Sequence, residues 1–150
     1  MVDVTVNTGA TVGISATLPT TYDADVGTGY ASLTFIDIGE IVDVGEISKV
    51  WEEVSHQAVG RSYPQKLKYT YNIDTVSLTV GRVTSDTGQT AIQTALGSMD
   101  SVAFEVTMNG GDVINFTGKV MKAGVGEISS GGIETTVVDI SPDPETLFES

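Results

Sequence analysis

The feature that most constrains the fold is an alternation of apolar and polar side chains on either side of Asn109-Gly110. Apolar residues take every second position over 102–108 before this pair and over 114–116 after it. A period of two places such side chains on one face of a β-strand, and Asn-Gly is the strongest short signal for a β-hairpin. The sequence therefore predicts an antiparallel hairpin over residues 102–120.

Two earlier segments, residues 63–72 and 76–80, show the same period. The apolar positions of the first segment are Leu67, Tyr69 and Tyr71. We expect each segment to be a strand with one solvent-facing side. Because the turn-forming residues 72–74 lie between them, the two strands are predicted to pair with each other. A β-branched run over 133–140 predicts a closing strand, which two following prolines end.

One segment has the period of a helix. Ser85 or Asp86 can cap its N-terminus, and Gly97 stands where a glycine commonly ends a helix. We expect a helix over residues 86–97 that lies on the sheet. Its apolar stripe consists of Ala91, Ile92, Ala95 and Leu96.

The first half of the chain contains less regular segments. Residues 19–30 have no apolar period, which predicts a long loop, and loops of that length in compact domains usually have a function. Residues 36–47 are β-branched and interrupted by glycines, with an acidic residue at every third position, which predicts a bulged strand. Residues 49–57 carry apolar side chains on both faces of a strand, and residues 58–64 connect this strand to the next.

Composition indicates a single acidic domain. The chain has 150 residues, of which 40% are hydrophobic, and this is enough to bury a core. Its 20 acidic and 7 basic residues give a formal charge of −13, which repels nucleic-acid phosphates. No apolar window of membrane-spanning length occurs, and residues 1–11 lack the pattern of a signal peptide, so we expect no membrane partner. We expect one domain over 1–140 and a polar tail over 141–150.

The basic residues are concentrated in the middle of the chain. Residues 49–82 have a net charge of +2, whereas residues 1–48 carry −7 and residues 83–150 carry −8. Such asymmetry often marks an interaction surface, although ordinary solvated charges give the same count. The basic residues of the middle segment are Lys49, Arg61, Lys66, Lys68 and Arg82.

The sequence offers no arrangement of residues typical of catalysis. It has no cysteine, which removes thiolate nucleophiles and thiolate metal ligands, and His56 is its one histidine. Glu52 and Glu53 are neighbours, but successive side chains of a strand point to opposite faces. No serine stands in a nucleophile elbow. We therefore expect a protein that is not an enzyme and that uses no cofactor.

Two features leave a ligand-binding function open. Asp23 and Asp25 begin like an oxygen-ligand calcium loop, but Thr28 and Thr34 stand where that loop needs glycine and glutamate. Strand aromatics are also a candidate ligand platform, although such residues more often belong to a core or a subunit interface. They are Trp51, Tyr63, Tyr69 and Tyr71. A calcium- or carbohydrate-binding β-sandwich module is therefore an alternative.

Taken in order, several segments resemble the major tail tube proteins of long-tailed, siphovirus-like bacteriophages. They are TVGISATLPTTYD at 11–23, IGEIVDVGE at 38–46, QKLK at 65–68 and DTGQ at 86–89. The resemblance runs from about residue 9 to residue 140 and rests on this order. It implies a mainly β fold, a β-sandwich or barrel with one flanking helix and long inter-subunit loops. It also implies six copies per ring, and rings stacked into a hollow tube through which the genome leaves the capsid.

The resemblance also implies partners and contact residues. The chain would assemble with itself and with other tail proteins such as the tape measure and the tail terminator, in a virion made in the cytoplasm of the bacterial host. The loop between subunits or rings would use Pro19, Thr21, Tyr22, Asp23, Asp25 and Tyr30. The hairpin that reaches a neighbour would use Trp51, Arg61, Tyr63, Lys66 and Lys68. We expect its bases to meet the acidic loop or the 37–46 strand of that neighbour.

An acidic lumen follows from the same implication. Six chains would carry a formal charge of −78 (6 × −13), and the Debye length at physiological salt is only about 8 Å. Such a wall would let duplex DNA pass without specific binding. The candidate lumen acids are Glu52, Glu105 and Asp112, on faces shared with Thr107, Asn115 and Thr117. Lys119 lies on the predicted face of Glu105, so either it pairs with an acid or the lumen face is assigned wrongly.

Other virion subunits have the same profile. A head decoration protein or a tail terminator is an alternative of the same class. An enzyme is the weakest candidate, because a partner chain would have to supply the missing catalytic groups.

Overall fold

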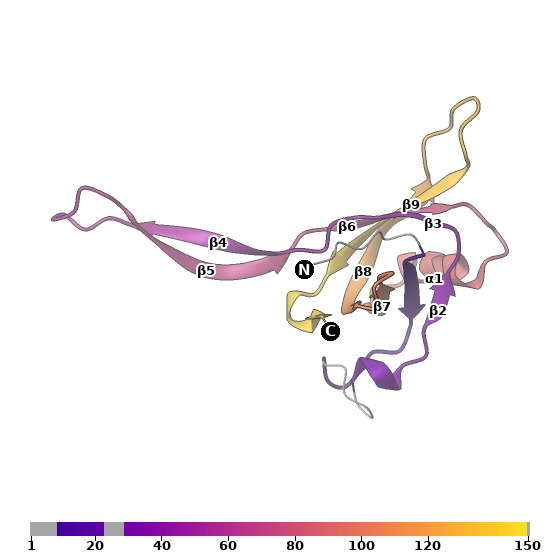
Figure 1. The fold of residues 1–150 in the computed structure, drawn as a ribbon, viewed down its shortest axis with the longest axis horizontal. Helices are drawn as coiled ribbons and strands as arrows, with labels where there is room; N and C mark the ends of the chain where they lie inside the picture. Colours follow the sequence, from indigo (N-terminus) through magenta and orange to yellow (C-terminus); the bar gives the residue numbers. More distant parts are fainter. Residues whose placement is uncertain (1–8, 23–28, 150) are drawn as a thin grey trace.

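The computed structural model describes residues 9–22 and 29–149, and this part of the chain is mainly β with a single α-helix (Figure 1). The helix α1 spans Thr87–Leu96, and the 3₁₀ turns are η1 (Tyr30–Ser32) and η2 (Pro144–Thr146). The strands are β1 (Thr11–Ser15), β2 (Ile36–Ile38), β3 (Ile41–Val44), β4 (Lys49–His56), β5 (Gln65–Ile73), β6 (Val76–Gly81), β7 (Val102–Thr107), β8 (Val113–Val125), β9 (Thr135–Pro142) and β10 (Phe148–Glu149).

Eight strands form one antiparallel sheet in the order β2-β1-β7-β8-β9-β6-β3, with β10 also paired to β8. The edge strands β2 and β3 lie at opposite ends of this order, although only Gly39 and Glu40 separate them in the sequence. The sheet therefore curls until its two edges approach each other. This is the mainly β architecture with one flanking helix that we expected.

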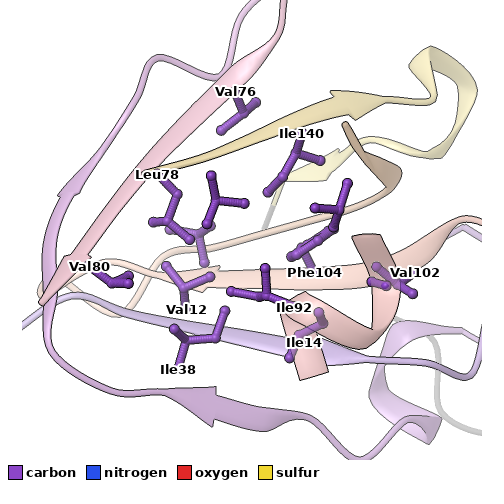
Figure 2. Close-up of a cluster of buried hydrophobic side chains, with 14 of the residues drawn as sticks. Val12, Ile14, Ile38, Val76, Leu78, Val80, Ile92, Val102, Phe104 and Ile140 are labelled. Carbon is purple, nitrogen blue, oxygen red and sulfur yellow. The ribbon is translucent and has the colours of Figure 1, made fainter. Parts of the chain in front are cut away.

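The concave face of the sheet holds the core (Figure 2). Phe104 and Phe116 lie opposite each other on β7 and β8, with ring centroids 5.4 Å apart, and both are fully buried. Val12, Leu78 and Val138 bring β1, β6 and β9 to the same cluster. Burying such a side chain stabilises the fold by roughly 1.5–3 kcal/mol. The predicted hairpin over 102–120 is confirmed, and its apolar face is the centre of the domain.

The helix forms as its sequence predicts. The Asp86 side chain caps it by accepting a hydrogen bond from the Gln89 N–H at 3.0 Å, and Gly97 is its C-cap. Ile92 and Ala95 are buried against the sheet. Leu96, which we expected in the buried stripe, is exposed because the stripe that reaches the core is narrower than predicted.

Hydrogen bonds from the start of α1 hold the corner between β2 and β3. The Asp86 carboxylate also accepts from the Gly39 N–H at 3.2 Å. The buried Gln89 amide donates to the carbonyls of Gly39 at 3.2 Å and Gly81 at 2.8 Å, and its oxygen accepts from the Val83 N–H at 3.0 Å. Every polar atom of this buried side chain therefore has a partner, as a stable interior requires.

Residues 36–47, expected to be one bulged strand, form two strands instead. Glu40 has a φ of 59°, in the left-handed region, and it turns the chain from β2 to β3. The expected bulge is present within β3, between Ile41 and Asp43. A Cβ at Gly88 would collide with the backbone of Asp37 and Ile38, so this glycine lets α1 lie directly on β2. The glycine of the DTGQ segment thus has a packing role.

The predicted pairing of the 63–72 strand with the 76–80 strand is wrong. β5 pairs with β4 in a separate two-stranded sheet, whereas β6 pairs with β3 and β9. Asp74 and Thr75 do not fold the chain back on itself but let it pass from the hairpin into the curled sheet. A short polar connection is compatible with either outcome, and long-range packing decides between them.

We expected the last residues to form a tail beyond the domain, but they fold back onto it. β9 continues through Pro142, and η2 and β10 then return the chain to β8. Thr146 is buried and its hydroxyl accepts from the Thr117 N–H at 3.0 Å, while the Tyr30 hydroxyl donates to the Thr146 carbonyl at 2.6 Å. Burial raises the pKa of Tyr30 to about 12. Residues 141–149 therefore form part of the packed structure.

Candidate assembly surface

The β4–β5 hairpin projects far from the curled sheet (Figure 1). Every residue of β4 is exposed, and β5 becomes buried only at its end, at Ile73. The exposed fraction is 44% for Trp51, 50% for Leu67 and 71% for Tyr69. An isolated two-stranded hairpin is marginally stable at best in water. Large apolar side chains exposed on such a ribbon are typical of a surface for contact with another molecule.

A β-bulge divides the side chains of this hairpin between its two faces. Trp51 lies opposite Tyr71, and Glu53 lies opposite Lys68, so β5 contains one more residue than β4 over this stretch. The extra residue reverses the alternation along β5. Tyr71 therefore shares a face with Lys68. The period-two pattern had predicted that Tyr71 would share a face with Leu67 and Tyr69.

The first face, here called the basic-aromatic face, is held together by its own contacts. Trp51 and Tyr71 pack with ring centroids 4.9 Å apart. The Lys49 ammonium lies 4.8 Å from the centroid of Tyr71, and the Lys68 ammonium lies 5.3 Å from that of Trp51. Such cation–π contacts are worth about 0.5–1 kcal/mol at exposed sites. Lys66 and Glu53 add an exposed ion pair at 4.0 Å, so the charges of this face are largely engaged within the chain.

The second face, here called the apolar face, carries Val50, Val54, Leu67 and Tyr69, together with the exposed side chain of Glu52. Val54 and Leu67 are directly opposite each other in the strand register. The four apolar side chains are exposed, with fractions between 42% and 71%. Among the described residues, no aromatic or charged contact ties this face to the rest of the chain. Burial of this face against a partner would therefore be the more favourable, because it would remove exposed apolar surface from water.

The two mid-chain arginines lie in different places, one at the tip of the hairpin and one outside it. Arg61 and Tyr63 lie in the connection between β4 and β5, and both are exposed. The Arg61 guanidinium donates to the Gln65 side chain at 2.7 Å, which orders the tip. Arg82 lies elsewhere, after β6, where its backbone N–H donates to the backbone carbonyl of Glu134. Four of the five mid-chain basic residues thus belong to the hairpin.

The predicted contact loop is described only in part. Asp23 and Asp25 fall outside the described residues. Pro19 is buried, and Thr21 and Tyr22 are exposed. Tyr30 begins η1 and is buried, because its hydroxyl anchors the C-terminal segment. Tyr30, named as a contact residue on sequence grounds, therefore has an internal partner in this chain.

The three candidate lumen acids do not lie together. Glu52 is on the projecting hairpin, Glu105 is half-buried on β7, and Asp112 is in the exposed loop before β8. Asn115 and Thr117, expected on the same wet face as Glu105, are both buried. The C-terminal segment is the reason, since Phe148 pairs with Asn115 and Asp143 accepts from the Thr117 hydroxyl at 3.0 Å.

Lys119, which did not suit an acidic face, has an acidic partner. Its ammonium lies 3.8 Å from the Asp143 carboxylate and donates to the Ser101 hydroxyl at 3.2 Å. This is the first of the two outcomes that the sequence left open. The signal that sequence reasoning missed was the C-terminal segment, which supplies Asp143 and was treated as an external tail.

A groove opens between β3 and the loop end of the β7–β8 hairpin. Its volume is about 550 Å³. Its apolar lining includes Ile41, Val42, Val44, Ile47, Met108 and Ile114. Val42 is 62% exposed, and Asp43 supplies an exposed carboxylate at the margin. A concave apolar surface of this volume is large enough to receive several side chains.

The described residues contain little else that suggests a ligand. Over 9–22 and 29–149, no three or more His, Asp or Glu side chains gather where they could hold a metal ion. No helix in this part of the chain is long and apolar enough to cross a membrane. The geometry thus offers surfaces for protein contact more clearly than a chemical site.

Comparisons with solved structures agree with this description, whereas the comparisons of sequence find no match. No protein-family model matches the sequence, and no curated protein matches it. Among solved structures, a chain of the six-fold-symmetrised anti-feeding prophage baseplate matches with a TM-score of 0.72 and 11% identity, covering 100% of this chain and 97% of that one. A chain of the sheath/tube terminator of an extracellular contractile injection system has a TM-score of 0.66 and 10% identity, covering 100% and 99%.

An Hcp protein has a TM-score of 0.51 and 10% identity, covering 89% of this chain and 88% of that one. At these identities the likeness concerns the fold. The phage-tail-like character that the sequence suggested is therefore found in the architecture, and the neighbours come from contractile systems, with nothing specific to siphoviruses. None of these descriptions names an enzyme. The chain has the fold of the tube and terminator proteins of phage-tail-like particles.

Proposed function

We propose that this chain is a structural subunit that forms homohexameric rings, and that these rings stack into the tube of a phage tail or tail-like particle. The observation that carries the proposal is the exposed β4–β5 hairpin on a tube-type fold. A two-stranded ribbon with exposed apolar side chains on both faces is marginally stable at best by itself. Contact with further copies of the chain would cover it.

The finer assignment is a major tail tube protein of a long-tailed bacteriophage, whose acidic channel conducts DNA during ejection. The charge of −13 per chain supports it, because a negative wall does not retain a polyanion. Residues 49–73 carry +2, so the rest of the chain carries −15 (−13 − 2). Four of the seven bases thus lie on the proposed contact element, whereas Arg82, Lys119 and Lys122 lie outside it. The tape measure and the tail terminator would be further partners in the virion.

A second candidate is a terminator or another ring at the end of a tube. It is favoured by the matches that cover the whole chain, which come from a baseplate structure and a terminator structure with TM-scores of 0.72 and 0.66. A chain of a sheath–tube complex has 0.58. An end ring would use the same fold but would not stack into long tubes.

Negative-stain electron microscopy and native mass spectrometry of the concentrated protein separate these functions. The tube subunit forms six-fold rings that stack, and the end protein forms single six-fold rings. A variant with residues 50–72 replaced by a short Gly-Ser linker should keep the circular dichroism of the curled sheet and stay monomeric. If the wild type is monomeric at every concentration, or if the linker variant assembles equally well, the proposal is wrong.

A further inference from the structure

The groove beside β3 follows a strand edge that pairs with no other strand of the described residues 9–22 and 29–149. In the order of the sheet, β3 stands last and pairs with β6 alone. Consecutive residues 41–45 line the groove. Because successive side chains of a strand point to opposite faces, the groove follows the edge of β3 and not one of its faces. Such an edge presents backbone N–H and C=O groups to which a further strand can pair.

The groove is also an opening in the hydrophobic core. Ile41, Val44 and Ile114 line it, and the same side chains pack against the core cluster. Val42 lines it as well and is 62% exposed. A strand placed here would pair its backbone with β3 and bury apolar side chains at the same time. The surface therefore fits a short extended segment in which apolar and polar residues alternate.

The described chain begins inside this groove, because Gly9 and Ala10 contribute to its lining. β1 and β2 pair antiparallel, and counting two places beyond their register sets Ala10 opposite Glu40. Gly9 has a φ of 94° and Glu40 a φ of 59°, so the chain turns at both of these neighbouring positions. After Glu40 the chain becomes β3. Residues 1–8, which precede Gly9, would therefore continue the antiparallel ladder along β3.

Residues 1–8 have the sequence that this edge requires. Val2, Val4 and Val6 alternate with polar residues, and this period of two is typical of a strand with one buried face. Valine is also enriched in strands. At about 3.3 Å per residue, an extended segment of this length spans roughly 26 Å, whereas β3 spans roughly 13 Å. The segment can therefore run along the whole of β3 from its attachment at Gly9.

We propose that residues 1–8 form a further strand that pairs antiparallel with β3 of the same chain and places Val2, Val4 and Val6 in the groove. The occupant is this segment and not a second copy, because its attachment point already lies in the groove and gives it a high effective concentration there. The strand covers the β3 edge and so opposes edge-to-edge aggregation. Because the pairing is internal to one chain, it holds whether or not the chain assembles into tubes.

Disulfide formation tests this pairing, because the chain has no cysteine of its own. Val44→Cys would be combined in turn with Val4→Cys or Val6→Cys, and in the matched controls with Thr5→Cys or Asn7→Cys. Each double variant would be oxidised as dilute monomer, and the loss of free thiols would be followed by alkylation and mass spectrometry. The two valine positions should lose their thiols at least tenfold faster than the two controls, because only they share the face of Val44, and the product should be a monomer. Equal rates at all four positions would overturn the proposal, and so would a disulfide-linked dimer, which would assign the groove to a second copy.

Hydrogen–deuterium exchange of β3 gives a second readout in which the groove itself is unchanged. Val4→Asp should raise the exchange rate of the β3 amides at least tenfold, because a carboxylate on the buried face cannot enter an apolar groove without a partner. Thr5→Asp adds the same charge on the opposite face and should leave this rate within twofold of the wild type. If the two variants exchange alike, the segment does not pair with β3 and the proposal is wrong.

Discussion

The molecule contains two antiparallel hairpins that their sequences describe almost alike and that the structure uses in opposite ways. In β7–β8, the alternating apolar side chains of Phe104 and Phe116 are fully buried at the centre of the domain. In β4–β5, Leu67 and Tyr69 occupy the same kind of position and are exposed at 50% and 71%. Alternation therefore specifies a strand, and the position of that strand in the fold decides what its apolar face contacts.

This difference separates stability from assembly. The β7–β8 hairpin lies inside an eight-stranded sheet and is covered by α1, so its side chains stabilise the single chain. Among residues 9–22 and 29–149, no further strand or helix is layered on the β4–β5 hairpin (Figure 1). Its side chains should contribute little to folding and much to contact between chains. Substitutions at matched positions of the two hairpins test this directly.

The largest effect is expected for Phe104→Ala. Removing a fully buried phenylalanine should lower the free energy of unfolding by about 3–5 kcal/mol. The matched change on the projecting hairpin, Leu67→Ala, should lower it by less than about 1 kcal/mol in the monomer, since that side chain is already half in water. Urea denaturation of dilute protein measures both. Equal losses would contradict the separation of roles.

The next effect is expected at the corner that closes the sheet. Gln89→Leu leaves Val83 N–H and the carbonyls of Gly39 and Gly81 without their partner, which should cost about 2–3 kcal/mol. Gln93→Leu is the control, because Gln93 is exposed on the same helix and its side chain makes no such bonds to the described part of the sheet. Thermal denaturation of the two variants gives the comparison. Similar melting temperatures would show that the corner does not depend on Gln89.

A smaller effect is expected where the C-terminal segment is anchored. Tyr30→Phe removes the hydrogen bond to the Thr146 carbonyl and should cost about 1 kcal/mol. Because the pKa of Tyr30 is raised from 10.0 to about 12, the folded chain keeps a proton that the unfolded chain loses between these values. The stability that Tyr30 contributes is complete below pH 10 and is lost as the pH rises toward 12. Denaturation of both proteins from pH 8 to pH 12 should show their difference shrinking over that window.

The smallest effect on folding, and a clear one on assembly, is expected for Arg61→Glu combined with Lys66→Glu. Both side chains are exposed on the hairpin, so the stability of the monomer should change by no more than about 0.5 kcal/mol. Assembly, measured by light scattering, should slow and lose its dependence on salt, because the hairpin no longer complements acidic residues on a neighbour. Unchanged assembly at every salt concentration would remove the electrostatic role of the hairpin.

The sequence predicts the parts of the fold that local rules determine. The β7–β8 hairpin follows from alternation around Asn109-Gly110, and the start of α1 follows from the Asp86 cap. The bulge in β5 escaped this reasoning, because one additional residue reverses the faces without changing the composition. Tyr71 was consequently placed with Leu67, whereas the structure places it with Trp51 and Lys68.

The candidate surface was predicted in outline only. The mid-chain bases and aromatics identified the hairpin as a contact element, and four of those bases do lie on it. The groove was not predicted, since Ile41, Met108 and Ile114 come together only when the sheet curls. The burial of Asn115 and Thr117 was missed for a related reason, because residues more than 25 positions away along the chain cover them. Contacts of such long range are not encoded in a local pattern.

Hydrogen–deuterium exchange before and after assembly tests the central claim most directly, namely that the β4–β5 hairpin is an assembly element and not part of the folding core. In dilute monomer, amides of β7 and β8 should exchange slowly and those of β4 and β5 rapidly. In rings or tubes, the exchange of β4 and β5 should slow by at least a hundredfold while that of β7 and β8 changes little. Slow exchange of β4 and β5 in the monomer, or rapid exchange that persists in the assembled protein, would contradict the account.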